Sequence, residues 1–243
     1  MRIDVYLSTE GMVSSRTEAK RFIDDGAVTV NGFLVKKPSF EVDGTEKIEI
    51  DKSKKEFVSR GGIKLKGALL EFKVNVEGRR CLDVGASSGG FTDCLLQNGA
   101  EHVIAVDSGS GQLAETLRTD PRVTSIENYN ARYMKPADFP YTPDFAVMDV
   151  SFISATYIIP SVFEVLGDNS DFICLIKPQF EVGRSGLGKG GIVKDSKVRD
   201  AAVKKVVDFA KDVGFVLKGI MQSSIKGGDG NIEFLAHFVK QRV

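Results

Sequence analysis

The hydrophobic and polar positions of the chain fall into two patterns, which divide at about residue 60. Beyond that point, short apolar runs of strand length alternate with stretches of helical periodicity. Alternation of this kind is typical of an open, largely parallel α/β sheet. Seven runs are predicted to be strands: residues 81–85, 102–107, 123–126, 145–150, 172–177, 215–222 and 232–239.

The last two predicted strands are too close together for a helix to lie between them. Only SSIKGGDGN (223–231) separates them, so we expect a hairpin that makes the final strand antiparallel to its neighbours. Seven strands with the last one antiparallel resemble the sheet of S-adenosylmethionine-dependent methyltransferases. The sequence therefore predicts a Rossmann-like α/β domain of this kind over residues 59–243.

The first 50 residues have the pattern of a small α+β domain. Ser15 and Glu18 have the spacing of a capping box, which predicts a helix over SRTEAKRFIDDG that ends at its glycine. The run AVTVNGFLV then alternates around an Asn-Gly pair, which is the strongest short signal for a hairpin. KIEI (47–50) adds a further strand.

Basic side chains gather on the predicted helix of this small domain. A helix of this kind, followed by a VNG hairpin, resembles the S4 RNA-binding domain over residues 1–50. The resemblance implies that the basic face docks on the phosphates of folded RNA, although a solvated helix face is the alternative. The candidate RNA contacts are Arg2, Arg16, Lys20 and Arg21, with Arg60 as a further one outside this domain.

Composition excludes several classes of protein. The 243 residues are 42% hydrophobic and 27% charged, as in ordinary soluble globular proteins. The chain has no run of about 18 apolar residues, and its amino terminus lacks the apolar core of a signal peptide. Three widely spaced cysteines (Cys81, Cys94, Cys174) indicate neither a disulfide framework nor a zinc site, so we expect a metal-free protein of the cytoplasm.

Charge is zero overall but unevenly distributed. Residues 77–171 hold six basic and fourteen acidic side chains, a net charge of −8. In contrast, residues 177–218 have a net charge of +5, and residues 51–66 one of +4. Such a distribution suits a protein that holds a small cofactor in one region and meets a polyanion with another. Residues 51–58 are predicted to form a charged linker between the two domains.

A glycine-rich loop, DVGASSGG (83–90), follows the first strand of the larger domain. Its spacing, G-x-x-x-G-G, differs from the dinucleotide fingerprint G-x-G-x-x-G and favours a ligand without phosphates. Asp107 ends the second strand, where a carboxylate can bind ribose hydroxyls, and Asp83 is placed to meet an ammonium group. S-adenosylmethionine is a ligand that has ribose hydroxyls and an ammonium group and lacks phosphates. The predicted cofactor residues are Asp83, Gly85, Ala86, Ser87, Gly89, Gly90 and Asp107; the alternatives are a tight turn required by the fold and, for Asp107, a helix cap.

Charged residues also stand at the ends of three other predicted strands. Asp149 and Lys177 end neighbouring strands, and Glu233 lies near the start of the antiparallel last strand, so all three are expected at the carboxyl edge where ligands bind. Methyl transfer to a ribose 2′-hydroxyl needs a base, and a lysine whose pKa is lowered by burial and a nearby cation can serve. Lys64, in SRGGIKLKG, supplies that second cation.

The set Lys64, Asp149, Lys177 and Glu233 resembles the catalytic tetrad of the FtsJ (RrmJ) family of RNA ribose 2′-O-methyltransferases. With the S4-like domain, the chain is still closer to the TlyA family, also called hemolysin A. The resemblance implies 2′-O-methylation of cytidines in ribosomal RNA with S-adenosylmethionine as donor, ribosomal subunits as partners, and further cofactor contacts from Asn130 and Asp149. The matching stretches are SRGG-x-KL, LDVGASSGGFTDCLL, GQL, DPRV, NAR, DVSFIS and KPQFEVGR.

Two glycine-containing loops of the larger domain are candidates to affect ligand binding. DSGSGQL (107–113) stands where members of the family tend to have DVGYGQL, and loss of the aromatic is expected to loosen packing around the cofactor ribose. GRSGLGKGG (183–191) is rich in glycine and basic residues. It is predicted to be either a substrate lid that grips phosphates or a mobile crossover connection.

The sequence disfavours three other functions. A small-molecule methyltransferase would leave the first 50 residues and the second lysine without a role. An RNA-binding protein with a non-catalytic cofactor domain would be expected to have lost a tetrad residue, and all four are present. A hemolysin would have to insert into a membrane, and the sequence has neither a spanning segment nor an obvious strongly amphipathic membrane helix.

Overall fold

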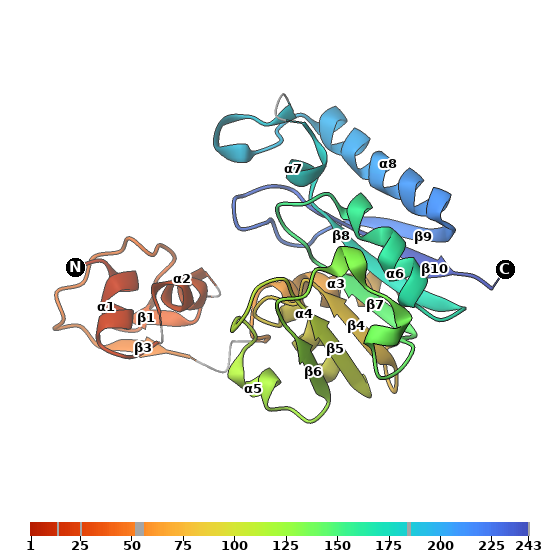
Figure 1. Cartoon of the computed structure of the whole chain (residues 1–243). Helices are drawn as coiled ribbons and strands as arrows, with labels where there is room; N and C mark the ends of the chain where they lie inside the picture. The colour runs from red at the N-terminus through yellow and green to blue at the C-terminus, as the bar shows by residue number, and fades with distance from the viewer. Residues whose placement is uncertain (14, 25, 52–55, 184–185, 243) are drawn as a thin grey trace. The chain divides into compact units, whose positions relative to one another are not determined.

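The structure is a computed structural model, which describes all residues except 14, 25, 52–55, 184–185 and 243 and omits the side chain of Arg21. The chain divides into two compact units, residues 1–56 and 57–243 (Figure 1). The basic run KSKK of the predicted linker lies outside the described residues.

The first unit packs two helices on a small antiparallel sheet. Ser15 Oγ accepts a hydrogen bond from the backbone N–H of Glu18 at 3.2 Å, which confirms the predicted start of the second helix. At the hairpin tip Asn31 and Gly32 have φ values of 50° and 82°, the conformation that an Asn-Gly turn favours. The short first helix was not predicted. The elements are α1 (Ile3–Thr9), α2 (Arg16–Asp24), β1 (Val28–Val30), β2 (Phe33–Leu34) and β3 (Ile48–Ile50), with the strands in the order β2-β1-β3.

The second unit is built on a seven-stranded sheet in the order β6-β5-β4-β7-β8-β10-β9. β10 is antiparallel to both β8 and β9, whereas the other described pairings are parallel, which confirms the predicted α/β fold with an antiparallel last strand. The strands are β4 (Arg80–Val84), β5 (His102–Val106), β6 (Val123–Ile126), β7 (Phe145–Met148), β8 (Ser170–Ile176), β9 (Phe215–Gln222) and β10 (Phe234–Lys240).

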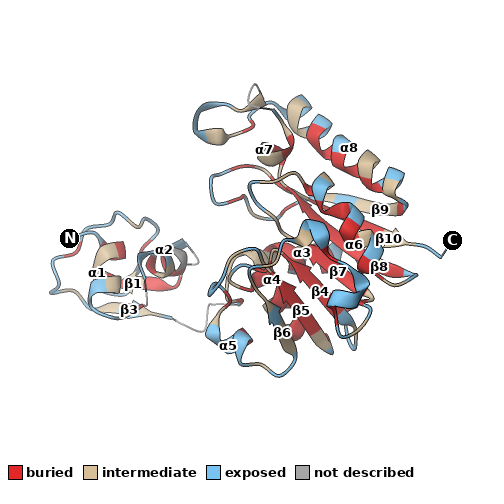
Figure 2. Ribbon diagram, viewed as in Figure 1, coloured by how far each residue is buried: buried red, intermediate tan, exposed pale blue. Residues whose placement is uncertain are grey.

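Helices cover both faces of this sheet, and most residues of its central strands are buried (Figure 2). Alternate residues of β4 point to opposite faces: Leu82 packs in the cluster formed with α6 and α8, and Cys81 packs in the cluster formed with α3 and α4. Burial on both faces explains why the central strands read as continuous apolar runs. The three cysteines are buried in the core. The helices are α3 (Gly61–Phe72), α4 (Gly90–Gln97), α5 (Glu115–Arg118), α6 (Ile159–Val165), α7 (Pro178–Glu181) and α8 (Ser196–Val213).

The second unit begins at Phe57, two residues before the boundary expected from the sequence. Phe57 is 6% exposed and packs with the α3–α4 side of the core. The backbone N–H of Val58 donates to Asp93 Oδ2 at 2.6 Å. Phe57 and Val58 therefore belong to the larger unit and not to the linker in which the sequence analysis had placed them.

Two glycines of α3 differ sharply in the space around them. A Cβ at Gly62 would lie 2.2 Å from the Phe57 ring, whereas one at Gly67 would meet no atom closer than 3.5 Å. We expect Gly62→Ala to lower the free energy of unfolding by about 1–3 kcal/mol through overpacking. Gly67→Ala should raise it by up to about 1 kcal/mol, because alanine favours the helix. Urea unfolding of the full chain measures both, and equal effects of the two variants would refute this packing.

Candidate active site

Three strand ends meet at one edge of the large sheet. β7 ends at Met148, β8 ends at Ile176, and β10 runs in the opposite direction from Phe234, which pairs with Ile176. β7 and β8 are parallel neighbours. Asp149, Lys177 and Glu233 therefore follow or precede their strands at the same carboxyl edge, where ligands of doubly wound sheets bind.

One buried and one half-buried ion pair stand at this edge. Lys177 Nζ lies 2.6 Å from Asp149 Oδ1, and Lys64 Nζ of helix α3 lies 2.5 Å from Glu233 Oε2. The Lys64 and Glu233 side chains are 10% and 3% exposed. A buried ammonium or carboxylate is costly unless an opposite charge pairs with it, so each pair keeps its two members in place. The structure thus brings together all four residues of the predicted tetrad as two neutral pairs.

The loop between β9 and β10 encloses the carboxylate of Glu233. The backbone N–H of Ser223 donates to the Glu233 carbonyl at 2.8 Å. At Gly227 a Cβ would lie 2.4 Å from Glu233 Oε1, so only glycine lets the backbone approach this closely. Asn231, which is buried, accepts from the backbone N–H of Val193 and donates to the carbonyl of Gly191. This anchors the described end of the 183–191 loop beside Glu233; residues 184–185 of the proposed lid lie outside the described residues.

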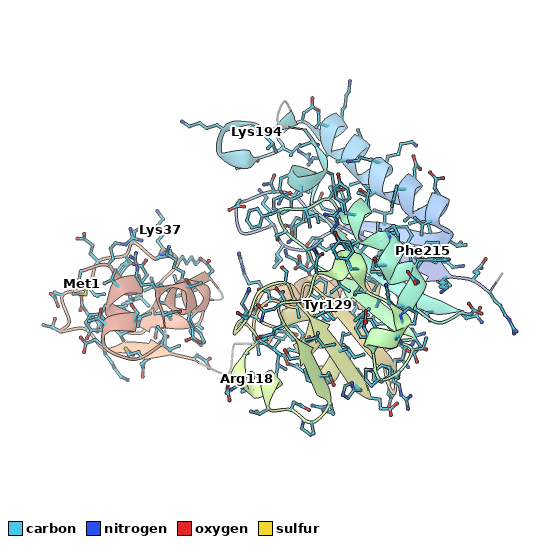
Figure 3. All side chains as sticks on the ribbon, in the orientation of Figure 1. Met1, Lys37, Arg118, Tyr129, Lys194 and Phe215 are labelled. Carbon is cyan, nitrogen blue, oxygen red and sulfur yellow. The ribbon has the colours of Figure 1, made fainter. Side chains whose placement is uncertain are left out.

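A cavity of about 380 Å³ opens next to Asp149. Of the predicted cofactor residues, Gly85, Ser87, Asp107, Asn130 and Asp149 line it, whereas Asp83, Ala86, Gly89 and Gly90 do not. Tyr129, labelled in Figure 3, also lines it from the loop beyond β6. Ser110, where the family tends to have a tyrosine, is exposed and not among the lining residues.

The glycines of the loop after β4 have two different roles. Gly85 has φ +83°, and a Cβ there would lie 2.5 Å from the carbonyl oxygen of Asp149, so glycine brings the loop against the cavity. A Cβ on Gly89 would meet Leu117 at 2.2 Å, and one on Gly90 would meet Ser59 Oγ at 2.1 Å. Gly89 and Gly90 are therefore needed for packing of the turn into α4.

Asp107 is held by the backbone of the loops on either side. Its Oδ2 accepts from the N–H of Ser87 and its Oδ1 from that of Gly109, both at 2.7 Å. Each carboxylate oxygen can accept a second hydrogen bond, so the side chain can still bind hydroxyl groups in the cavity. Asn130 Oδ1 accepts from the N–H of Arg132 and caps a short 3-10 helix, η2 (Ala131–Tyr133).

Asp83 is fully buried behind the loop. Its Oδ2 accepts from Thr92 Oγ1 at 2.7 Å, but its Oδ1 has no hydrogen-bond partner among the described residues. Burial raises the pKa of Asp83 to about 7. A buried polar atom without a partner is unusual and is consistent with a ligand donor such as an ammonium group.

Several residues of the site were missed by sequence reasoning. Lys177 Nζ donates to Ser151 Oγ at 2.7 Å, and Glu181 accepts from Ser154 Oγ at 2.5 Å and from the Ala155 N–H at 2.7 Å. Glu181 therefore joins the loop after β7 to helix α7, which follows Lys177. The motifs DVSFIS and KPQFE contained these residues, but their pairing across the chain is visible only in the fold.

An aromatic surface adjoins the cavity. Phe152 is 92% exposed, lines the cavity and has φ +64°, a conformation that is costly for a bulky residue. Its ring lies 5.1 Å from that of Phe180. Nearby in sequence, the exposed Tyr157 stacks with the Arg132 guanidinium at 4.9 Å. Exposed aromatic rings with an arginine are suited to stacking with nucleic-acid bases.

Comparison with known proteins agrees with this architecture. The sheet order and the loop after its first strand are those of the S-adenosylmethionine-dependent methyltransferase fold. A solved structure of such a methyltransferase from Mesorhizobium loti has a TM-score of 0.53 at 14% identity. The match covers 71% of this chain and 95% of the M. loti chain. The FtsJ-like methyltransferase family matches residues 57–240, and the S4 domain matches residues 1–48. The chain belongs to the FtsJ-like methyltransferase family and carries an amino-terminal S4 domain.

Several known proteins are similar to nearly the whole chain. The chain is 42% identical over 234 residues to the 16S/23S rRNA (cytidine-2′-O)-methyltransferase TlyA of Mycobacterium tuberculosis, covering 96% of this chain and 87% of that one. It is 44% identical over 240 residues to Hemolysin A of Brachyspira hyodysenteriae, covering 98% and 100%. A solved structure of a candidate hemolysin from Streptococcus thermophilus has a TM-score of 0.79 at 45% identity, covering 99% and 88%.

Two further observations concern membrane-spanning helices and metal-ligating side chains. Within the described part of the chain, no helix combines the length and the apolar character needed to cross a membrane. The described residues also contain no group of three or more His, Cys, Asp or Glu side chains that could hold a metal ion.

The raised pKa of Asp83 leads to a pH dependence of cofactor binding. Below about pH 7 the buried carboxyl is protonated, and pairing with the ammonium group of S-adenosylmethionine requires that the proton leave. We expect affinity to rise from pH 6 to pH 8, and the rise to disappear in Asp83→Asn. Isothermal titration calorimetry measures both; an unchanged pH profile in the variant would contradict the assignment.

Proposed function

We propose that this chain transfers the methyl group of S-adenosylmethionine to the 2′-hydroxyl of cytidines in ribosomal RNA, with Lys64, Asp149, Lys177 and Glu233 as the catalytic residues. The observation that carries the proposal is the two lysine–carboxylate pairs at the strand ends, one buried and one half-buried; Asp149 of the half-buried pair lines the cavity beside the glycine loop. The activity named for the TlyA relative from M. tuberculosis, at 42% identity, supports the same reaction.

S-adenosylmethionine fits the groups around the cavity. Asp107 can accept hydrogen bonds from ribose hydroxyls, and Asn130 lies where an adenine edge can be bound. The unpartnered Oδ1 of Asp83 suits the ammonium group of the methionine part. The close approach of Gly85 to Asp149 places the cofactor loop beside the ion pairs. When bound, the cofactor supplies an electrophilic methyl group on a sulfonium.

Lys177 is suited to position and deprotonate the ribose hydroxyl. Its Nζ lies 2.6 Å from Asp149 Oδ1 and donates to Ser151 Oγ at 2.7 Å, so two neighbours fix the amine at the edge of the sheet where ligands bind. In the reaction the neutral amine takes the hydroxyl proton as the oxygen–carbon bond forms and the sulfur–carbon bond breaks, and the proton then passes to solvent.

Lys64 is suited to stabilise the oxygen as its charge develops. Its ammonium uses one N–H for Glu233, which fixes the side chain and leaves donors for the substrate. The two pairs thus have different roles: Lys177 accepts the hydroxyl proton, and Lys64 stabilises the developing charge on the oxygen.

The S4 domain is proposed to bind the RNA. Arg2 and Arg16 have side chains that are 46% and 53% exposed, and Lys20 is exposed one turn beyond Arg16 on α2. Basic groups on a rigid helix contact phosphates and position a domain on folded RNA. Arg60, half-buried in the second unit, and the exposed Phe152 are further candidate contacts.

Replacement of the proposed base tests the catalytic assignment. Lys177→Met should lower the rate of methyl transfer from labelled S-adenosylmethionine to ribosomal subunits by about 10²-fold or more, because general-base catalysis contributes on this scale. Cofactor affinity should change little. Lys211→Met, at an exposed site on α8, is the matched control and should keep full activity. An active Lys177→Met enzyme would refute the role of Lys177.

Neutralising the basic face tests the RNA assignment. Lys20→Gln and Arg16→Gln should each weaken binding to transcribed 16S and 23S rRNA and reduce the slope of log K against log salt by about 1, since each removes one phosphate contact. Lys47→Gln is the control, because Lys47 pairs with Glu49 on β3. Unchanged slopes in both α2 variants would exclude this face as the RNA surface.

A further inference from the structure

A fully buried carboxylate lies beneath two of the proposed RNA-binding arginines. Asp4, in the first turn of α1, has a side chain that is 0% exposed. Arg2 Nε donates to its Oδ1 at 2.9 Å and Arg2 Nη2 to its Oδ2 at 3.1 Å. Arg16 Nη2, from the start of α2, donates to the same Oδ2 at 3.0 Å. One carboxylate therefore holds arginines that are 14 positions apart in the sequence.

Both arginines keep an exposed edge despite these bonds. The contacts with Asp4 use two of the five N–H donors of Arg2 and one of those of Arg16. The Arg2 and Arg16 side chains as a whole remain 46% and 53% exposed. The triad has a net charge of +1, so it can still attract an anion. The hydrogen bond from Arg2 lowers the pKa of Asp4 to about 2, so the carboxylate is ionised at neutral pH.

Backbone hydrogen bonds and burial of the neighbouring side chains fix the position of Asp4. Its backbone N–H donates to the carbonyl of Pro38 at 3.3 Å, and that of Ile3 donates to Phe40 at 2.7 Å. Ile3 and Leu7 on the same helix are fully buried in the core of the unit. The carboxylate is thus fixed relative to both helices, and it transmits that order to the two long side chains.

We propose that Asp4 is a positioning residue for RNA binding, which holds Arg2 and Arg16 as a preformed pair for phosphates of the RNA backbone. The inference rests on the proposed RNA-binding function of the S4 domain. Free arginine side chains lose conformational entropy when a partner immobilises them, and a carboxylate that immobilises them beforehand removes that cost. A planar guanidinium held in this way presents its remaining donors to phosphate oxygens in a defined direction.

Asp4→Asn in the full chain separates this role from simple charge effects. The variant is nearly isosteric and makes the RNA-binding unit more positive by one charge. An acidic residue without a positioning role would therefore weaken RNA binding, and its removal would tighten it. We expect the opposite, a loss of affinity of about 3- to 10-fold for transcribed 16S and 23S rRNA, as the two side chains become free.

Glu41→Gln is the matched control. Glu41 is exposed, its backbone pairs with that of Arg2, and its replacement removes the same charge from the same region. RNA affinity should stay the same or rise in this variant. A double-mutant cycle adds a readout that a structural role would not move: in an Arg16→Gln background, the effect of Asp4→Asn on RNA binding should shrink.

A measurement on the unaltered protein removes any dependence on the folding of the variant. The ¹⁵Nε order parameters of Arg2 and Arg16 in the RNA-free chain should approach the value of rigid backbone, about 0.85, whereas values below about 0.6 would overturn the inference. Equal or tighter RNA binding by a folded Asp4→Asn protein would also overturn it. If Arg16→Gln and Lys20→Gln leave RNA binding unchanged, the proposed RNA surface itself fails, which is a distinct result.

Discussion

Pairing of buried lysines with carboxylates is the constraint on which the larger unit depends. An ammonium group at 10% exposure is stable only with an opposite charge against it, and Lys64 and Lys177 each have one within 2.6 Å. These pairs tie α3 to the start of β10 and the end of β8 to the end of β7. The same contacts that stabilise the fold also bring two cations and two anions to the carboxyl edge of the sheet, where Asp149 lines the cavity.

The reversed direction of β10 makes this arrangement possible. In an all-parallel sheet the residue before a strand would lie at the edge remote from the ligand, but the start of β10 lies next to the end of β8. Glu233 can therefore reach Lys64 across the carboxyl edge. The first unit has a comparable arrangement on a smaller scale, since the buried carboxylate of Asp4 pairs with Arg2, just before α1, and with Arg16, at the start of α2.

Periodicity and turn chemistry predicted much of the fold. Short apolar runs and the short SSIKGGDGN connection predicted the seven strands of the large sheet and the antiparallel last one, and the Asn-Gly pair predicted the hairpin of the first unit, because these signals are local. The location of Asp149, Lys177 and Glu233 at one edge followed from strand order. Interactions between distant residues could not be predicted in this way: the burial of Phe57 against Gly62, the anchoring of Ser154 by Glu181 and the packing role of Gly89 depend on tertiary contacts.

The central claim is that the paired lysines direct a methyl group to a ribose oxygen. Its most direct test is mass spectrometry of nucleosides from ribosomal RNA incubated with the protein and S-adenosylmethionine that carries a trideuterated methyl group. The account predicts label in 2′-O-methylcytidine and its absence when Lys177 is replaced. Label in base-methylated nucleosides, or no label in any intact subunit or free ribosomal RNA, would contradict it.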